Sequence, residues 1–192
     1  KSGRDGIRVE GSTNERNNIT ANIILNSTGS GIFINNTKTA SQLIQSNNIS
    51  YSSNFSILLS NASNITIISG SLEYSRVGLN ASQSVNVTVT NATFVLNTLW
   101  DFYVTNNSYI TSLNNSFNKS AVNITNSQGD YSNFTNQYYV DVNVTGSDSN
   151  AISGATVFAY ENSTSSWVQR WTEATAASGF TGKWAVTEYV QN

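Results

Sequence analysis

Apolar residues recur two positions apart along the first two thirds of the chain, and this spacing is the period of a β-strand. The pairs return every 22 to 25 residues. They are Ile7/Val9, Ile32/Ile34, Phe55/Ile57, Val77/Leu79, Trp100/Phe102 and Val122/Ile124. A repeat this short holds about three strands and leaves no room for a helix. It therefore predicts the coils of a right-handed parallel β-helix.

Two further sets of apolar residues lie between these pairs. One is the column Leu25, Ile49, Leu72, Phe94 and Phe117, and the other is the motif Ile65/Ile67, Val87/Val89 and Ile110. Three positions before the column stand Asn22, Ser46, Ser69, Asn91 and Asn114. Because small polar residues suit sharp bends, these positions predict corners between strands. We expect equivalent strands to pair from coil to coil, about 4.8 Å apart, around aliphatic ladders.

The pattern changes after about residue 127. The alternating stretch YYVDVNVTG (138–146) and the segment ISGATVFAY (152–160) predict antiparallel strands. The expected strands are 138–145, 154–160, 166–172 and 183–190. The chain is thus expected to be all-β, with a parallel β-helix over residues 1–130 and an Ig-like β-sandwich over residues 131–192. Four or five strands leave such a sandwich incomplete, so the remainder is expected either outside this sequence or as a strand donated by another copy.

Two segments carry a resemblance to known families. The stretches FSILLSNASNITIISGSLEY (55–74) and VGLNASQSVNVTVTNATFVL (77–96) resemble pectate-lyase-like β-helices, most of all the NosD/CASH-type repeats of secreted and archaeal surface proteins. The C-terminal V-x-V-x-V, SGATV and T-x-x-A-x-G-F patterns are similar to carboxypeptidase-regulatory-like, transthyretin-like sandwich domains. The resemblance implies an extracellular surface protein. It implies a fold more than an activity, because the β-helix family includes lyases, hydrolases and structural chains.

Composition narrows the chemistry. Asn, Ser and Thr make up about 42 % of the 192 residues, and the chain has no His, Cys, Pro or Met. Without His and Cys there is no catalytic dyad of the Ser–His or Cys–His type, no disulfide and no conventional zinc site. The net charge of −2 is spread thinly, so no nucleic-acid partner is expected. No apolar run is long enough for a membrane span, and neither a metal nor a cofactor is expected.

The sequence contains 17 Asn-x-Ser/Thr motifs, where shuffling of this composition gives about 8. The excess predicts covalent N-linked glycans. A geometric origin is the alternative, since an outward Asn and Thr flanking an inward aliphatic residue generate the same motif. The candidate sites are Asn18, Asn26, Asn35, Asn54, Asn61, Asn64, Asn80, Asn86, Asn106, Asn118, Asn133, Asn143 and Asn162. Of these, Asn64 and Asn86 should point outward, and Asn61, Asn80 and Asn106 should follow the first strand of a coil.

Acidic residues are the remaining candidates for catalysis. Glu73 aligns with Ser50 and Val95 one coil away, and Asp101 is expected to face outward between Trp100 and Phe102. Because no two acids share a column in adjacent coils, the pair of carboxylates that glycoside chemistry requires is missing. No catalytic residue is assigned, and the chain is expected not to be an enzyme.

Two features suggest binding surfaces. Tyr51 and Tyr74 occupy one column and are expected to stack at a corner, which suggests either packing or carbohydrate binding. Ile7 and Val9 begin a coil with no evident cap, so they form a candidate assembly surface for another subunit. The alternative is that upstream coils are absent from this sequence. Lys1 is not a natural start and suggests a processed or excised piece.

Together with the resemblance, these patterns predict a structural, self-assembling and N-glycosylated extracellular protein of a surface layer, sheath or filament, and the resemblance implies an archaeal type. The alternative is an adhesin or carbohydrate-binding stalk, and a more remote one is a lyase-like enzyme. The abundant Asn, Ser and Thr fit bends and outward columns, and the low charge opposes side-by-side packing only weakly.

Overall fold

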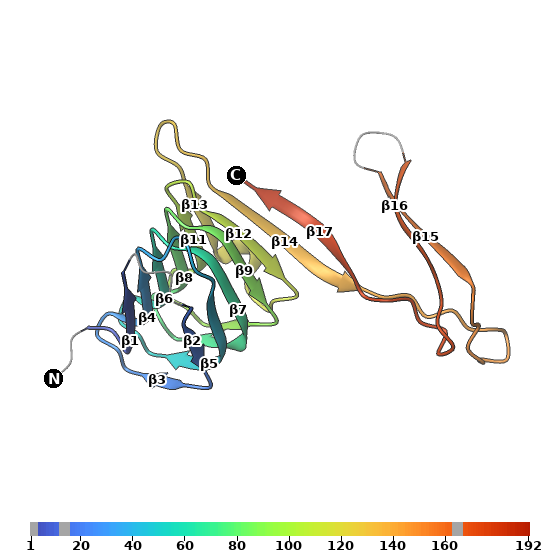
Figure 1. Ribbon diagram of the computed structural model, residues 1–192, viewed down its shortest axis with the longest axis horizontal. Coiled ribbons are helices and arrows are strands. Elements are labelled where there is room, and N and C mark those ends of the chain that lie inside the picture. Colours follow the sequence, from blue (N-terminus) through green and yellow to red (C-terminus); the bar gives the residue numbers. More distant parts are fainter. Residues whose placement is uncertain (1–3, 12–15, 163–166) are drawn as a thin grey trace. The chain divides into compact units, whose positions relative to one another are not determined.

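The computed structural model describes residues 4–11, 16–162 and 167–192, with the side chain of Asn162 left out. Its described residues are strands, turns and a single turn of 3₁₀-helix, Lys119–Ala121. The chain divides into two compact units (Figure 1). The first consists of Lys1–Gln137 together with Thr187–Asn192, and the second is Tyr138–Val186. The described residues form no helix that could serve as a membrane span.

The first unit is a parallel β-solenoid of about six turns, as the repeat predicts. One wall is a six-stranded sheet in which every neighbouring pair is parallel. Its strands are, in order, β1 (Ile7–Glu10), β4 (Ser30–Asn35), β6 (Phe55–Ser60), β8 (Val77–Ser82), β11 (Trp100–Thr105) and β13 (Val122–Thr125). The stack of green and blue arrows in Figure 1 shows this order.

The second sheet of the solenoid bends, so that it supplies two walls. Its strands are β2 (Asn18–Thr20), β3 (Ile23–Leu25), β5 (Gln42–Ser50), β7 (Ser63–Glu73), β9 (Val85–Thr90), β10 (Thr93–Val95), β12 (Tyr109–Leu113), β14 (Asn133–Val140) and β17 (Trp184–Gln191). The first half of β5 pairs with β2 and the second half with β3. The strand turns the corner at Ser46, where φ is +54°, and β7 does the same at Ser69, where φ is +58°.

The predicted corner column is confirmed in four of five coils. Ser46, Ser69, Asn91 and Asn114 all have φ between +54° and +58°. In the first coil the bend falls on Ala21 (φ +55°) and not on Asn22. A second corner has positive φ at Asn26, Tyr51, Tyr74 and Leu96, and a third has it at Asn36, Asn61, Gln83 and Asn106. Each coil therefore turns through left-handed residues, for which Asn is the best non-glycine choice.

The register differs from the sequence alignment at three places. At one of them Phe102 pairs with Val122, although the alignment pairs Trp100 with Val122. Ile32 pairs with Ile57, and Ile34 with Leu59, so the true partners lie two residues beyond the predicted pair Phe55/Ile57. That shift keeps the same face inward, because strand side chains alternate with a period of two. In the first coil, Ile24 and not Leu25 pairs with Ile49. This shift of one residue places Leu25 outside, 57 % exposed, and Ile24 in the core.

The solenoid interior is a dry stack of aliphatic and aromatic side chains. Ile32, Ile57, Leu79 and Phe102 form one fully buried ladder, with 0 % exposure each. Toward the later coils phenylalanines take over, and the rings of Phe94 and Phe102 lie 4.3 Å apart. Burying each such side chain stabilises the fold by roughly 1.5–3 kcal/mol.

A column of small residues stands directly before this ladder. It contains Gly6, Gly31, Ser56, Gly78, Asp101 and Ala121. A Cβ atom on Gly31 would lie 2.2 Å from Cγ2 of Ile49, and one on Gly78 would lie 2.5 Å from Cδ1 of Phe94. The corner thus leaves little room inside, which explains the small residues at these positions.

The last coil lies beyond the predicted boundary at residue 130. Residues 133–137 of β14 continue the stack in parallel with β12. The chain end returns to the same coil, where β17 is the next strand beyond β14. There Asn133 donates a 2.7 Å hydrogen bond to Asn192, and Asn136 a 2.8 Å bond to Glu188. Residues 187–192 therefore belong to the solenoid unit.

The second unit contains a two-stranded antiparallel sheet of β15 (Thr156–Asn162) and β16 (Trp167–Ala174). Two isolated antiparallel bridges, Asn143 with Phe180 and Thr145 with Ala151, join its loops. Trp171 and Trp184 stack with their rings 5.1 Å apart. The described residues of this unit do not form the two packed sheets of an Ig-like sandwich, so the predicted sandwich is not confirmed.

Candidate interaction surfaces

Tyr51 and Tyr74 stack on the outside of the solenoid, as expected from their shared column. Their ring centroids lie 5.0 Å apart, the planes differ by 7°, and the residues are 55 % and 39 % exposed. Both have left-handed backbone angles, with φ of +56° and +50°. A bulky residue in this conformation is strained. Asn26 holds the equivalent corner in the first coil at φ +56°, so an unstrained residue fits the same backbone.

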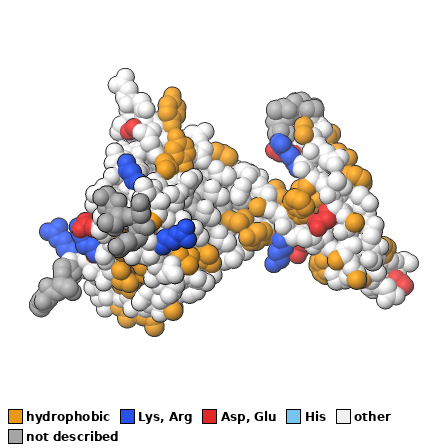
Figure 2. Space-filling model, viewed as in Figure 1, with side chains coloured by type: hydrophobic (Ala, Val, Ile, Leu, Met, Phe, Trp, Pro, Cys, Tyr) orange, Lys and Arg blue, Asp and Glu red, His pale blue; other side chains and the backbone are white. Residues whose placement is uncertain are grey.

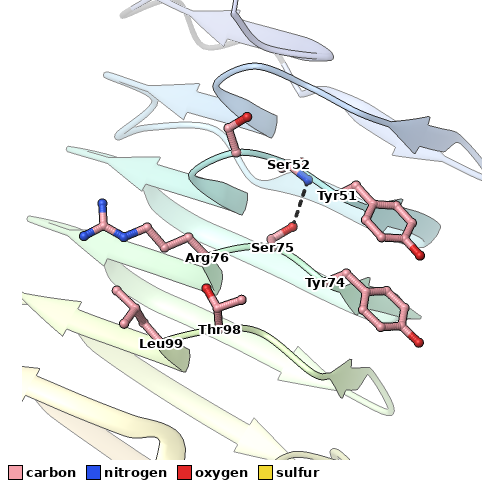
Figure 3. A pocket seen from close by; sticks show the side chains of 8 residues that line it. Tyr51, Ser52, Tyr74, Ser75, Arg76, Thr98 and Leu99 are labelled. Carbon is pink, nitrogen blue, oxygen red and sulfur yellow. Dashed lines mark hydrogen bonds between the residues drawn. The ribbon is translucent and has the colours of Figure 1, made fainter.

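A shallow groove of about 510 Å³ runs beside the two tyrosines. Figure 3 shows the tyrosines along one side and Arg76 and Leu99 along the other, with Ser75 and Thr98 between them. The other lining residues are Ser52 and Ser53. In the described part of the chain Arg76 has no ion-pair partner. The groove therefore combines an aromatic wall with an uncompensated cation.

The hydroxyl of Ser75 on the floor of the groove is fully engaged. It accepts hydrogen bonds from the Ser52 amide (3.2 Å) and the Ser56 hydroxyl (2.9 Å), and it donates to the carbonyl of Glu73 (3.2 Å). Similar bonds recur at the third corner, where each of three serine hydroxyls accepts a hydrogen bond from a backbone amide in the preceding coil. These serines are Ser84, Ser108 and Ser132. Such bonds satisfy buried corner amides. The hydroxyl of Ser52, which also lines the groove, has no hydrogen-bond partner among the described residues.

Asp101 does not face outward as the alternation predicted. The residue is 4 % exposed, and its carboxylate accepts hydrogen bonds from the Asn97 side chain (2.9 Å) and the Asn118 amide (2.8 Å). It belongs to the inward column of small residues, where the strand enters the corner. These bonds make it a structural acid that fixes two neighbouring loops.

The other acids remain dispersed. Glu73 pairs in register with Ser50 and Val95, as predicted. Arg8 forms ion pairs with both Asp5 and Glu10. The hydrogen bond between Arg8 and Glu10 raises the pKa of Arg8 and lowers the pKa of Glu10. Asp130 accepts a hydrogen bond from Asn107. Among the described residues no three acids come close enough to hold a metal ion.

The structure distributes the candidate glycosylation sites over three classes. Exposed residues are Asn18, Asn26, Asn54, Asn86, Asn118 and Asn143. Half-buried residues are Asn35, Asn61, Asn64, Asn106 and Asn133, and Asn80 is buried. The side chain of Asn162 lies outside the described residues. Asn61 and Asn106 do follow the first strand of their coils, but Asn80 lies within β8.

Neighbouring coils decide the accessibility of these asparagines. Asn80 is 8 % exposed because Leu58 and Tyr103 flank it in the adjacent coils. Asn86 donates a 3.1 Å hydrogen bond to Asn64, so these two form a ladder on the outer surface. The same geometry that creates the motif therefore also uses some of its amides for stacking.

Ile7 and Val9 lie in β1 at the N-terminal end of the described solenoid. Both are half-buried and pack against the core, and β1 pairs with β4 on one side. Four aliphatic residues that the periodicity did not identify as surface residues are 46–75 % exposed, and they are Ile23, Leu25, Leu96 and Leu99. Ile23 precedes the inward Ile24, so a register taken from Ile24 would have identified Ile23 and Leu25 as outward.

The second unit exposes apolar side chains on its hairpin. Phe158, Tyr160 and Trp167 are 52 %, 53 % and 70 % exposed. The one ion pair described within the hairpin joins Arg170 to Glu161. A two-stranded sheet with exposed aromatic residues is marginal by itself and has free edges for another strand.

No protein-family model matches the sequence, and neither curated proteins nor solved structures show significant similarity to it. The architecture and surfaces described above therefore carry the functional argument.

Proposed function

We propose that this chain is a structural, self-assembling extracellular protein of a cell-surface layer, sheath or filament. The observation that carries the proposal is the solenoid itself, a parallel stack of about six coils with an aliphatic interior and a neutral, polar exterior. Its stability comes from repeated backbone pairing and packing, which suit a mechanical role. The dispersed acids give no support to a lyase-like activity, and we propose that the chain is not an enzyme.

The finer assignments belong to the same proposal. They are right-handed winding of the NosD/CASH type, an archaeal source and an Ig-like fold for the C-terminal segment. The two-stranded sheet of the second unit supports completion by a strand from another copy, because both outer edges are available for pairing among the described residues. The exposed asparagines support covalent N-linked glycans on the outer surface, and Ile7 and Val9 support an end-to-end contact.

An adhesin or carbohydrate-binding stalk is the second candidate. It is favoured by the exposed, stacked Tyr51 and Tyr74 beside Arg76, since aromatic faces and a cation are common in saccharide sites. The first proposal explains more of the molecule, because it also accounts for the hairpin edges and the length of the solenoid.

Negative-stain electron microscopy of the purified chain separates the two functions. Ordered tubes, sheets or fibres are expected for a structural protein, and monodisperse rods would argue for a stalk. Intact mass before and after enzymatic or chemical deglycosylation of material from the native host tests the glycans. An unmodified mass would refute the N-linked glycans and would leave the proposed self-assembly unchanged.

A further inference from the structure

One corner of the solenoid exposes apolar side chains in four consecutive coils. This corner stripe consists of Ile23, Leu25, Tyr51, Tyr74, Leu96 and Leu99, with exposures from 39 % to 75 %. Figure 2 shows hydrophobic side chains at the edge of the solenoid where β3 lies in Figure 1. Soluble monomers normally scatter such residues singly, and a continuous row indicates an interaction surface.

The backbone of the stripe points to the same conclusion. Tyr51, Tyr74 and Leu96 all adopt left-handed angles, with φ from +49° to +56°. Asn would meet this backbone requirement at lower cost, as Asn26 does. Strained residues that persist at exposed positions are characteristic of functional surfaces.

The stripe has two chemically different sides. The rings of Tyr51 and Tyr74 line one side of the groove, and Arg76 and Leu99 line the other (Figure 3). Glu73 precedes Tyr74 on the aromatic side. In the described part of the chain neither Arg76 nor Glu73 has an ion-pair partner. Each half of the surface thus carries one unpaired charge of opposite sign.

We propose that the corner stripe binds the corner stripe of a second copy of this chain, about a two-fold axis parallel to the solenoid. This rotation places the aromatic side of each copy against the Arg76 and Leu99 side of the other. Arg76 then meets both an aromatic face, by a cation–π contact, and the carboxylate of Glu73. The surface is self-complementary in charge, as an isologous contact requires.

A second copy fits this groove better than a saccharide. The two tyrosine rings cover each other's inner faces, and the floor hydroxyl of Ser75 has no free capacity. Arg76 is the one charged group that lines this groove, and the other polar lining side chains carry only hydroxyl groups, so no carboxylate or amide among the lining residues could orient a saccharide. The inference rests on the proposed self-assembly and names the surface and the symmetry that it uses.

The test is sedimentation equilibrium of the full chain with charge-reversal variants. Wild type is expected to dimerise reversibly, and Arg76→Glu and Glu73→Arg should each weaken dimerisation by about tenfold or more. The double variant Arg76→Glu/Glu73→Arg should restore most of the affinity. The matched control is Lys38→Glu, which reverses an exposed charge away from the groove and should change nothing. Circular dichroism verifies that each variant is folded.

Three outcomes would overturn the inference. The first is a monomeric wild type, and the second is dimerisation that Arg76→Glu leaves unchanged. The third is binding of an acidic oligosaccharide by monomeric protein, lost in Tyr51→Ser/Tyr74→Ser, by isothermal titration. Electron microscopy of the same samples separates this inference from the proposed function. Ordered assemblies that persist in folded Arg76→Glu would refute the corner contact alone, and absence of assemblies in wild type would refute self-assembly.

Discussion

The solenoid and the second unit are built from similar strands but bury them very differently. In the six-stranded wall of the solenoid every inner strand has a parallel neighbour on both sides, and Ile57, Leu79 and Phe102 are fully buried. In the hairpin of the second unit, Phe158, Tyr160 and Trp167 remain more than half exposed. The contrast shows that strand pattern alone does not create a core. Stacking of equivalent strands does, because each coil covers the apolar face of the next.

The largest effect is expected from removing a central core ring. Phe102→Ala deletes a fully buried side chain that packs against Phe94, Phe117 and Phe134. The cavity should destabilise the solenoid by about 3–5 kcal/mol, measured by chemical denaturation. Phe158→Ala in the hairpin is the control and should change the free energy of unfolding by less than about 0.5 kcal/mol. Equal losses would break the comparison between the two units.

A smaller effect is expected from filling the tight inner corner. In Gly78→Ala the new Cβ meets Phe94 at 2.5 Å and the Asp101 carbonyl oxygen at 2.8 Å, so it should destabilise by about 1–3 kcal/mol. Gly154→Ala in the second unit meets nothing within 4 Å. Because Gly154 has φ of +75°, its replacement by Ala should cost only about 1 kcal/mol of backbone strain. Thermal unfolding of both variants measures the difference, and a neutral Gly78→Ala would show that the corner can relax.

Replacement of Leu96 is expected to stabilise the solenoid, in contrast to the two changes above. Leu96 is 71 % exposed and has φ +49°, so Leu96→Asn should relieve strain and stabilise the solenoid by about 0.5–1 kcal/mol. The same change removes one member of the corner stripe and should weaken dimerisation. Denaturation at low protein concentration, followed by sedimentation, separates the two readouts. A destabilised monomer would show that Leu96 packs within its own chain.

The smallest effect concerns pH at the last coil. Hydrogen bonds from Lys119 and, less strongly, Asn136 lower the pKa of Glu188. The pKa of Glu188 is therefore lower in the folded state than in the unfolded chain. Its contribution to the free energy of unfolding is complete above the ordinary glutamate pKa of about 4.3 and is lost as the pH falls. Urea denaturation between pH 3 and 6 should show this loss, and Glu188→Gln should reduce it. An identical pH profile for the variant would assign the dependence to other acids.

Alternation along the strands predicted the solenoid well, because a register error of two residues leaves the same side chains facing inward. Aligning Phe55/Ile57 with Ile32/Ile34 was two residues off, yet the inward face was still correct. Choosing Leu25 instead of Ile24 was one residue off and exchanged core for surface. A period of two makes even shifts harmless and odd shifts decisive.

Accessibility could not be predicted in the same way. Asn80 and Asp101 both alternate with inward residues, but the structure buries both. Asn80 is covered by side chains 22 and 23 residues away, and Asp101 is held by Asn118 across a loop. The return of residues 187–192 to β14 is also non-local and has no signature in the sequence.

The sequence by itself therefore determined the repeat, the three walls, one of the three corners in four of its five coils, and the stacking of Tyr51 on Tyr74. These follow from local periodicity and from the backbone angles that each residue type tolerates. Only the tertiary structure decided which outward residues are exposed, how the last coil is joined by the chain end, and that Arg76 and Leu99 face the tyrosines across a groove. Those features depend on contacts between residues of different coils, and the free energy of such contacts is fixed by packing and not by the order of residues in one strand.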